Sequence, residues 1–168
     1  MVRFKSRYML FEILYPPTAE EYTAFTEANN FVLEPALLQH HKVTPSDVNN
    51  RVLVYEIKKS LQHFFGDYGL GRGTSMFQLK YFSNSTSTGI LRCSKDDYEY
   101  VLMTLNMMKK IGTLENVIIN VVKVSGTIKK LEEFAISRSD ELMRALNQDK
   151  KDFLQSMSSI PVDKNEDI

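Results

Sequence analysis

Two adjacent lysines, Lys129 and Lys130, fall in the first turn of a predicted helix that follows an apolar strand. The amino end of a helix carries partial positive charge, so carboxylates are favoured there and lysines are not. An anion at this end would remove the conflict, because the free N–H groups, the helix dipole and both lysines would attract it. Gly126 would let the backbone approach such a ligand closely, and Ser125 or Thr127 can cap the helix. Lysines extended into water are the other interpretation, and the sequence leaves both open.

The charges are sorted along the chain although they sum to zero. Lysine and arginine together number 21, as do aspartate and glutamate. Residues 12–34 carry only acidic charges, whereas only basic charges occur between Asp67 and Asp96 and again between Glu115 and Glu132. A neutral total can therefore hide a basic face, which is the electrostatic footprint of a polyanion. Strands that are simply poor in acidic residues would give the same pattern, so both explanations stay open.

The residue types that usually carry catalysis or bind metals form no recognisable pattern. His40 and His41 are adjacent, so neither a helix nor a strand would present both on one face, and we expect solvated loop residues. The one cysteine, Cys93, excludes a disulfide framework and indicates a reducing, intracellular setting. No apolar run reaches membrane-spanning length, and a signal-peptide pattern is absent. We predict no catalytic residue, no metal ligand and no cofactor bound by the chain itself.

Hydrophobic periodicity and cap residues predict the regular elements. Strands rich in branched and aromatic residues are expected at 7–15, 76–82, 88–93 and 116–124. The first helix starts at Thr44 and ends at Gly66, and the second starts at Ser94 and ends at Gly112. The third helix starts near Thr127 and continues to about residue 147.

Three stretches are expected to be irregular. Residues 16–43 are interpreted as a surface insertion, and residues 148–168 as a frayed or disordered tail. The glycine-rich stretch 67–75 precedes a strand and lacks the Gly-Lys-Ser/Thr ending of a nucleotide-binding loop, so we expect a mobile connector. Residues 1–147 would then form a single domain.

The order strand, helix, strand, strand, helix, strand and a further helix defines the expected fold class. It is α+β: a ferredoxin-like or RRM-like split βαβ (βαββαβ) domain with an antiparallel four-stranded sheet and an additional C-terminal helix. Two helices would cover one sheet face, and the other would stay open unless the last helix or a partner covers it. RRM domains stack bases on sheet aromatics through an RNP1 motif that this sequence lacks, so that readout is not supported. Glu12, in the nearly apolar first strand, needs a base or a helix end as partner.

The two middle strands form a predicted hairpin around turn-forming residues 84–87. Strand alternation places Phe77, Leu79 and Tyr81 on one face and Lys80 on the other. Lys80 and Arg92 would then share the open sheet face if the register permits.

The second helix has an unusually wide apolar surface. Met103, Met107 and Ile111 extend it beyond the stripe that covers one sheet. These residues are either core filler or a patch that faces a partner, and the sequence does not decide between them.

Three long blocks carry a resemblance to a known family: residues 3–12, residues 79–84 with 86–93, and residues 122–130. They resemble the Pop-five family, small protein subunits of eukaryotic and archaeal ribonuclease P that eukaryotes share with RNase MRP. The blocks are similar to those of fungal members. The likeness covers residues 1–15 and 44–138, and the acidic insertion and the tail match nothing that we can place.

The resemblance implies an RRM-like accessory subunit of a ribonucleoprotein endoribonuclease. Precursor tRNA would be cut to free its 5′ end, and rRNA processed, by magnesium ions held on the RNA subunit. The implied partners are the ribonuclease P and MRP RNA, a TIM-barrel-like ribonuclease P protein subunit and other particle proteins, with precursor tRNA nearby and no membrane. The implied location is the nucleus and nucleolus, with a single copy in the eukaryotic particle.

We hypothesise that cations from three distant parts of the chain converge into one surface that holds RNA phosphates. The assigned residues are Arg3, Lys5 and Arg7 in an arm, Lys80, Asn84, Thr86, Thr88 and Arg92 on the hairpin, and Lys123, Ser125, Thr127, Lys129 and Lys130 at the helix start. Two alternatives remain: a protein–protein adaptor with a ferredoxin-like fold and no direct RNA contact, and a ferredoxin-like small-molecule enzyme or regulator.

Overall fold

The computed structural model describes residues 5–17, 40–140 and 144. Its elements are β1 (Ser6–Leu14), α3 (Asn50–Gly73), β2 (Gln78–Ser83), β3 (Thr88–Ser94), α4 (Tyr98–Met107), β4 (Lys110–Ile111), β5 (Leu114–Glu115) and β6 (Ile118–Ser125). A further helix, here called the C-terminal helix, begins at residue 128 and is described to residue 140. Most of the expected insertion and all of the expected tail lie outside the described residues.

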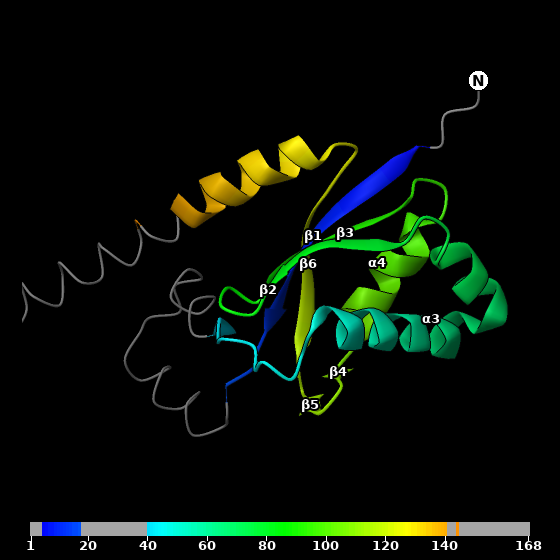
Figure 1. Ribbon diagram of the computed structural model, residues 1–168, viewed down its shortest axis with the longest axis horizontal. Coiled ribbons are helices and arrows are strands. Elements are labelled where there is room, and N and C mark those ends of the chain that lie inside the picture. Colours follow the sequence, from blue (N-terminus) through cyan, green and yellow to red (C-terminus); the bar gives the residue numbers. More distant parts are fainter. Residues whose placement is uncertain (1–4, 18–39, 141–143, 145–168) are drawn as a thin grey trace, which may run out of the picture.

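The main sheet has the strand order β2-β3-β1-β6, and every neighbouring pair is antiparallel. With α3 between β1 and β2 and α4 between β3 and β6, this is the split βαβ arrangement. The predicted α+β fold with an additional C-terminal helix is therefore confirmed. Figure 1 shows the sheet between two layers, with α3 and α4 on one face and the C-terminal helix on the other.

The principal core lies between the sheet and the helices α3 and α4. Alternate residues of β1 point into it because successive side chains of a strand face opposite ways. The fully buried members include Met9, Phe11 and Ile13 of β1, Leu53, Ile57 and Leu61 of α3, and Val101 and Leu105 of α4. Phe11 also stacks on Phe82 of β2, with ring centroids 6.4 Å apart.

The C-terminal helix covers part of the sheet face that the sequence left open. Leu131 is fully buried there against Leu10 of β1 and Ile90 of β3. The β1–β6 register shifts at Val122, which packs in the same cluster. Such an extra residue turns consecutive side chains toward one face.

A buried ion pair fastens this helix to the sheet. Glu12 is 2% exposed, and both of its carboxylate oxygens accept hydrogen bonds from Arg138 Nη2, at 3.0 and 3.1 Å. The side-chain amide of Asn120 donates a third bond to Glu12 at 2.7 Å. The expectation that Glu12 needs a basic partner is confirmed.

The predicted starts of the first two helices, at Thr44 and Ser94, are wrong. Asn49 caps α3, and its Oδ1 accepts from the backbone N–H groups of Arg51 and Val52 at 3.0 Å each. Thr44 instead lies buried, where its hydroxyl donates to Ser87 Oγ at 2.8 Å. The start of α4 lies at Tyr98 rather than near Ser94.

The glycine-rich stretch is helical rather than a mobile connector. At Gly66 the backbone has φ +64° and ψ −166°, which kinks α3 without ending it. Beyond the kink, Arg72 Nε donates to Asp97 Oδ1 at 2.7 Å, and Asp97 is only 6% exposed. This contact joins the second segment of α3 to the start of α4.

The helix α4 ends at Met107, five residues before the predicted end at Gly112. A small β4–β5 hairpin occupies the intervening stretch, and Gly112 has the positive φ of +57° that its turn requires. Lys110 Nζ and Glu115 Oε1 lie 2.7 Å apart across this hairpin. Each of its strands has only two residues, which explains why periodicity did not reveal it.

Substitution Gly89→Ala should destabilise the domain by about 1 to 3 kcal/mol, because an added methyl group overpacks the core. A Cβ at this position would lie 2.4 Å from Phe11 Cζ and 3.0 Å from the carbonyl oxygen of Tyr81. Chemical denaturation measures the change. Gly71→Ala is the matched control, since a Cβ there meets nothing within 4 Å. Equal stability of the two variants would contradict the packing described for Phe11.

Substitution Arg138→Ala should destabilise the domain by about 2 to 4 kcal/mol, because it leaves the buried Glu12 carboxylate without its charged partner. Arg144→Ala is the control, since Arg144 is exposed in the same region of the chain. The double variant Glu12→Gln/Arg138→Met should lose less than the sum of the two single changes. Urea unfolding of the variants tests this, and a loss for Arg138→Ala no larger than for Arg144→Ala would refute it.

Candidate nucleic-acid interface

Basic residues from three parts of the chain meet at one end of the sheet, where β1 begins and β3 and β6 end. Ser6 pairs with Ser94 of β3, and Tyr8 pairs with both Arg92 of β3 and Ser125 of β6. The backbone oxygen of Lys5 accepts from the N–H of Lys95 at 2.9 Å. We call this region the basic end and define it by Lys5, Arg7, Arg92, Ser125, Thr127, Lys129 and Lys130.

The two arginines of the basic end are half-buried and held in place. Arg92 donates from Nε and Nη2 to Ser6 Oγ, at 3.0 and 2.9 Å. Arg7 reaches the turn before the C-terminal helix, since a Cβ at Gly126 would lie 3.2 Å from Arg7 Nη1. The arginines are therefore positioned before any ligand arrives.

The start of the C-terminal helix completes the basic end. Ser125 Oγ accepts from the N–H of Thr127 at 3.3 Å, and the helix begins one residue later. Lys129 and Lys130 are exposed in its first turn, as predicted. Lys129 Nζ lies 4.0 Å from Glu133 Oε1, with side chains 82% and 64% exposed. An ion pair this exposed contributes little and leaves the lysine available to an anion.

Lys123 lies outside this group although it is close in sequence. It pairs with Leu10, on the face that the C-terminal helix covers. Its ammonium sits 4.3 Å from the centroid of the Phe134 ring. This cation–π contact helps to seat the helix.

The hairpin tip lies away from the basic end, so the expected single surface is divided. Thr88 pairs with Glu12, six positions along β1 from Ser6, which corresponds to about 20 Å of strand. Asn84 Nδ2 donates to the backbone oxygens of Pro45 and Val48, both at 2.9 Å. The expectation that arm, hairpin and helix start converge is thus correct for Lys5, Arg7, Arg92 and the helix-start residues from Ser125 to Lys130, and wrong for Lys123 and the tip. RNA contact by Asn84, Thr86 and Thr88 stays a prediction.

The prediction that Lys80 and Arg92 share a sheet face encounters a bulge in β2. Gln78 is the partner of Arg92, and the β2–β3 register then shifts between Leu79 and Tyr81, so Lys80 has no Cα partner in β3. Tyr81 pairs with Ile90, whose side chain faces the C-terminal helix, and Tyr81 therefore does not share the face of Leu79 as predicted. The alternation of residue types along a strand does not show where a bulge inserts an extra residue. Beyond the bulge, every side chain of the strand faces the side opposite to the predicted one. Arg3 lies outside the described residues.

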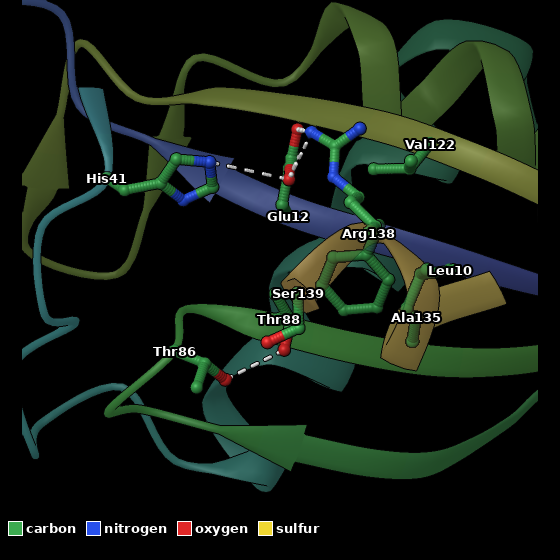
Figure 2. A pocket seen from close by; sticks show the side chains of 10 residues that line it. Leu10, Glu12, His41, Thr86, Thr88, Val122, Ala135, Arg138 and Ser139 are labelled. Carbon is green, nitrogen blue, oxygen red and sulfur yellow. Dashed lines mark hydrogen bonds and ion pairs between the residues drawn. The ribbon is translucent and has the colours of Figure 1, made fainter. Parts of the chain in front are cut away.

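A cavity of about 230 Å³ lies beside the Glu12–Arg138 pair, between the sheet and the C-terminal helix. Figure 2 shows Glu12 between Arg138 and His41, whose Nε2 is 3.6 Å from Glu12 Oε2. His41 is half-buried there, so the expectation of a solvated loop histidine is wrong. Thr86 and Thr88 line the cavity with their hydroxyl oxygens 2.8 Å apart.

Arg138 and Asn120 were not identified from the sequence, although a signal for Arg138 was present. Arg138 follows Leu131, Phe134 and Ala135 at helical spacing, so it belongs to the stripe that faces the sheet. A base on an apolar stripe, together with an acid inside an apolar strand, indicates such a pair.

The residues proposed to face a protein partner divide between surface and core. Met103 and Met107 are 51% and 47% exposed, as a partner surface requires. Ile111 is fully buried in the principal core, so its assignment to that surface is corrected.

The side chains that most often serve as nucleophiles or metal ligands are few in the described part of the chain and are not grouped. Burial raises the pKa of the Cys93 thiol to about 12, so this thiol is protonated at neutral pH and is a poor nucleophile. Within residues 5–17, 40–140 and 144, no three His, Cys, Asp or Glu side chains are grouped so as to hold a metal ion. The helices described there are too short or too polar to span a bilayer.

Comparisons with known proteins agree with one another. The "Ribonuclease P/MRP protein subunit POP5" of Saccharomyces cerevisiae is 46% identical over 146 residues, which cover 87% of this chain and 82% of the relative. The protein of the same name from Schizosaccharomyces pombe is 40% identical over 83% of this chain and 88% of the relative. A "Probable ribonuclease P/MRP protein subunit POP5" of Arabidopsis thaliana is 29% identical over 88% of this chain and 93% of the relative.

Residues 7–136 also match the sequence profile of the Rpp14/Pop5 family. This match spans β1 through the greater part of the C-terminal helix, and it includes both arginines of the basic end. The chain therefore belongs to the Rpp14/Pop5 family.

Proposed function

We propose that this chain is an RNA-binding protein subunit of ribonuclease P and RNase MRP. The names of the curated relatives support membership of such a particle. The observation that carries RNA binding is the basic end, where Arg7 lies beside the amino end of a helix that bears Lys129 and Lys130, and Arg92 is held on Ser6 of the same strand as Arg7. Free N–H groups, the helix dipole and these cations all attract phosphate oxygens.

In this proposal the chain contributes to 5′ maturation of precursor tRNA and to rRNA processing without performing the cleavage. Magnesium ions on the RNA subunit would carry out the chemistry, and the basic end would neutralise phosphates so that the RNA keeps its active shape. The working location would be the nucleus and nucleolus. A TIM-barrel-like protein subunit would be a neighbour in the particle, with Met103 as one contact.

The most direct experiment is to identify the RNA that co-purifies with the tagged full-length chain. Ribonuclease P and MRP RNAs are expected, and nuclease treatment should separate the chain from part of the particle. If nuclease leaves the complex intact and no RNA is recovered, the protein adaptor is favoured instead.

Substitution of Lys129 and Lys130 by alanine should flatten the salt dependence of RNA binding. The slope of log K against log salt should fall by roughly 0.7 for each single-stranded phosphate that the variant no longer neutralises. Titration of the co-purifying RNA at several salt concentrations measures the slope. The control is Arg51→Ala/Lys58→Ala, which removes two exposed charges from α3. An unchanged slope for the lysine variant would remove the helix start from the interface.

A further inference from the structure

The helical face of the domain carries a second basic surface that is separate from the basic end. A groove of about 550 Å³ runs between α3 and the segment that joins α4 to β4. Its lining includes Glu56, Lys59 and His63 of α3, Met107 at the end of α4, Lys109 of the joining segment and Lys110 of β4. We call it the α3–β4 groove. It lies against the principal core, on the opposite side of the sheet from the C-terminal helix.

Two carboxylates lie near this groove: Glu115, which pairs with Lys110, and Glu56, which is part of the lining. Glu115 lies 2.7 Å from Lys110 Nζ, and this hydrogen bond, together with the charge of Glu115, raises the pKa of Lys110. Lys59 and Lys109 are exposed and have no ion pair with any described carboxylate. The groove lining therefore holds two lysines outside any ion pair with a described carboxylate, against the single carboxylate of Glu56, and both lysines can meet an incoming anion.

The cations flank a partly apolar floor. Phe64 is half-buried and contacts His63 edge-on, with ring centroids 5.3 Å apart. Met107 is 47% exposed in the same lining. Grooves that bind single-stranded nucleic acid combine cations along the phosphate backbone with side chains on which bases pack, chiefly aromatic ones. In this groove Lys59 and Lys109 supply the cations, and Phe64 and Met107 supply the apolar surface.

The groove is built on fixed backbone. Lys109 accepts a hydrogen bond at its carbonyl from the N–H of Val117 at 3.1 Å. Ile111, two residues later, is fully buried and anchors the β4–β5 hairpin in the core. Lys59 and His63 are four residues apart on α3, so they share one side of that helix. The two walls are therefore positioned without a ligand.

We propose that the α3–β4 groove is a second RNA-binding site, which holds a single-stranded segment with its phosphates on Lys59 and Lys109 and a base against Met107. This inference rests on the proposed function, since it concerns the same ligand class. It assigns Met107 to RNA rather than to a protein partner. Two sites on opposite faces would let one small chain hold two separate parts of a folded RNA.

The test is the binding of a short fluorescent oligouridylate to the full chain at several salt concentrations. Lys59→Ala/Lys109→Ala should weaken binding and lower the salt slope by roughly 0.7 for each phosphate left without its lysine. The control Arg51→Ala/Lys58→Ala removes two charges from another side of α3 and should change the slope less. Circular dichroism verifies that each variant is folded.

The outcomes separate this inference from the proposed function. A reduced slope for Lys129→Ala/Lys130→Ala but not for Lys59→Ala/Lys109→Ala overturns the groove and keeps the basic end. An equal reduction in the control also overturns it, since the effect would then be one of net charge. Absence of oligouridylate binding by the unaltered chain overturns the groove, while the co-purification experiment still decides the proposed function.

A second readout uses the assembled particle. A photo-crosslinking amino acid in place of Met107 should attach to RNA, and the same group in place of Tyr55, which is 62% exposed on α3, serves as the control. Attachment at Met107 to protein alone would show a protein-docking groove and overturn the RNA assignment.

Discussion

The buried Glu12 carboxylate is the constraint on which the functional arrangement depends. A charge placed in a central strand of an apolar sheet is strongly unfavourable unless it is paired and hydrogen-bonded. Arg138 satisfies it from the C-terminal helix, and Asn120 satisfies it from β6. The pair therefore selects one position of the helix on the sheet. Because the helix is rigid, the same contact fixes where its amino end, with Lys129 and Lys130, meets Arg7.

The covered sheet face separates this protein from domains that read RNA by stacking bases on their sheets. Leu131 and Phe134 occupy the area over Leu10 and Val122. A base cannot stack there while the helix is docked. In the proposed function, RNA contact is left to the ends of strands and to grooves between helices, where backbone N–H groups and cations act on phosphates rather than on base edges.

The sequence was informative about the fold because strand alternation and helical spacing are strong signals in this chain. The four main strands and their order along the chain followed from local patterns, and the fold class then followed from the element order of split βαβ domains. Helix boundaries were less predictable. Thr44 is a residue type that often caps helices, but its hydroxyl takes part in a buried hydrogen-bond network. Gly66 kinks α3 at the position where the helix was expected to end. Tertiary contacts outweighed local preference at both positions.

Residues of the candidate nucleic-acid interface could be placed from the sequence only where neighbouring residues indicated their position. The helix-start lysines and the arm were recognised from residue type and position, whereas their separation from the hairpin tip depends on register. The bulge at Lys80 and the pairing of Arg138 with Glu12 join residues that are distant in sequence, and no local pattern encodes them. The α3–β4 groove was missed for the same reason, because its walls come from two helical regions and a hairpin too short to show periodicity.

The kink in α3 has a structural consequence beyond its effect on helix length. The start of α4 has no side-chain cap of its own, since Asp97 makes no such hydrogen bond to the first turn. The redirected last turns of α3 bring the Arg72 guanidinium to that carboxylate. Arg72 at the end of α3 thus supplies the positive charge that pairs with Asp97 at the start of α4. The second segment of α3 and the first turn of α4 should accordingly order and melt together, as one cooperative unit within the domain.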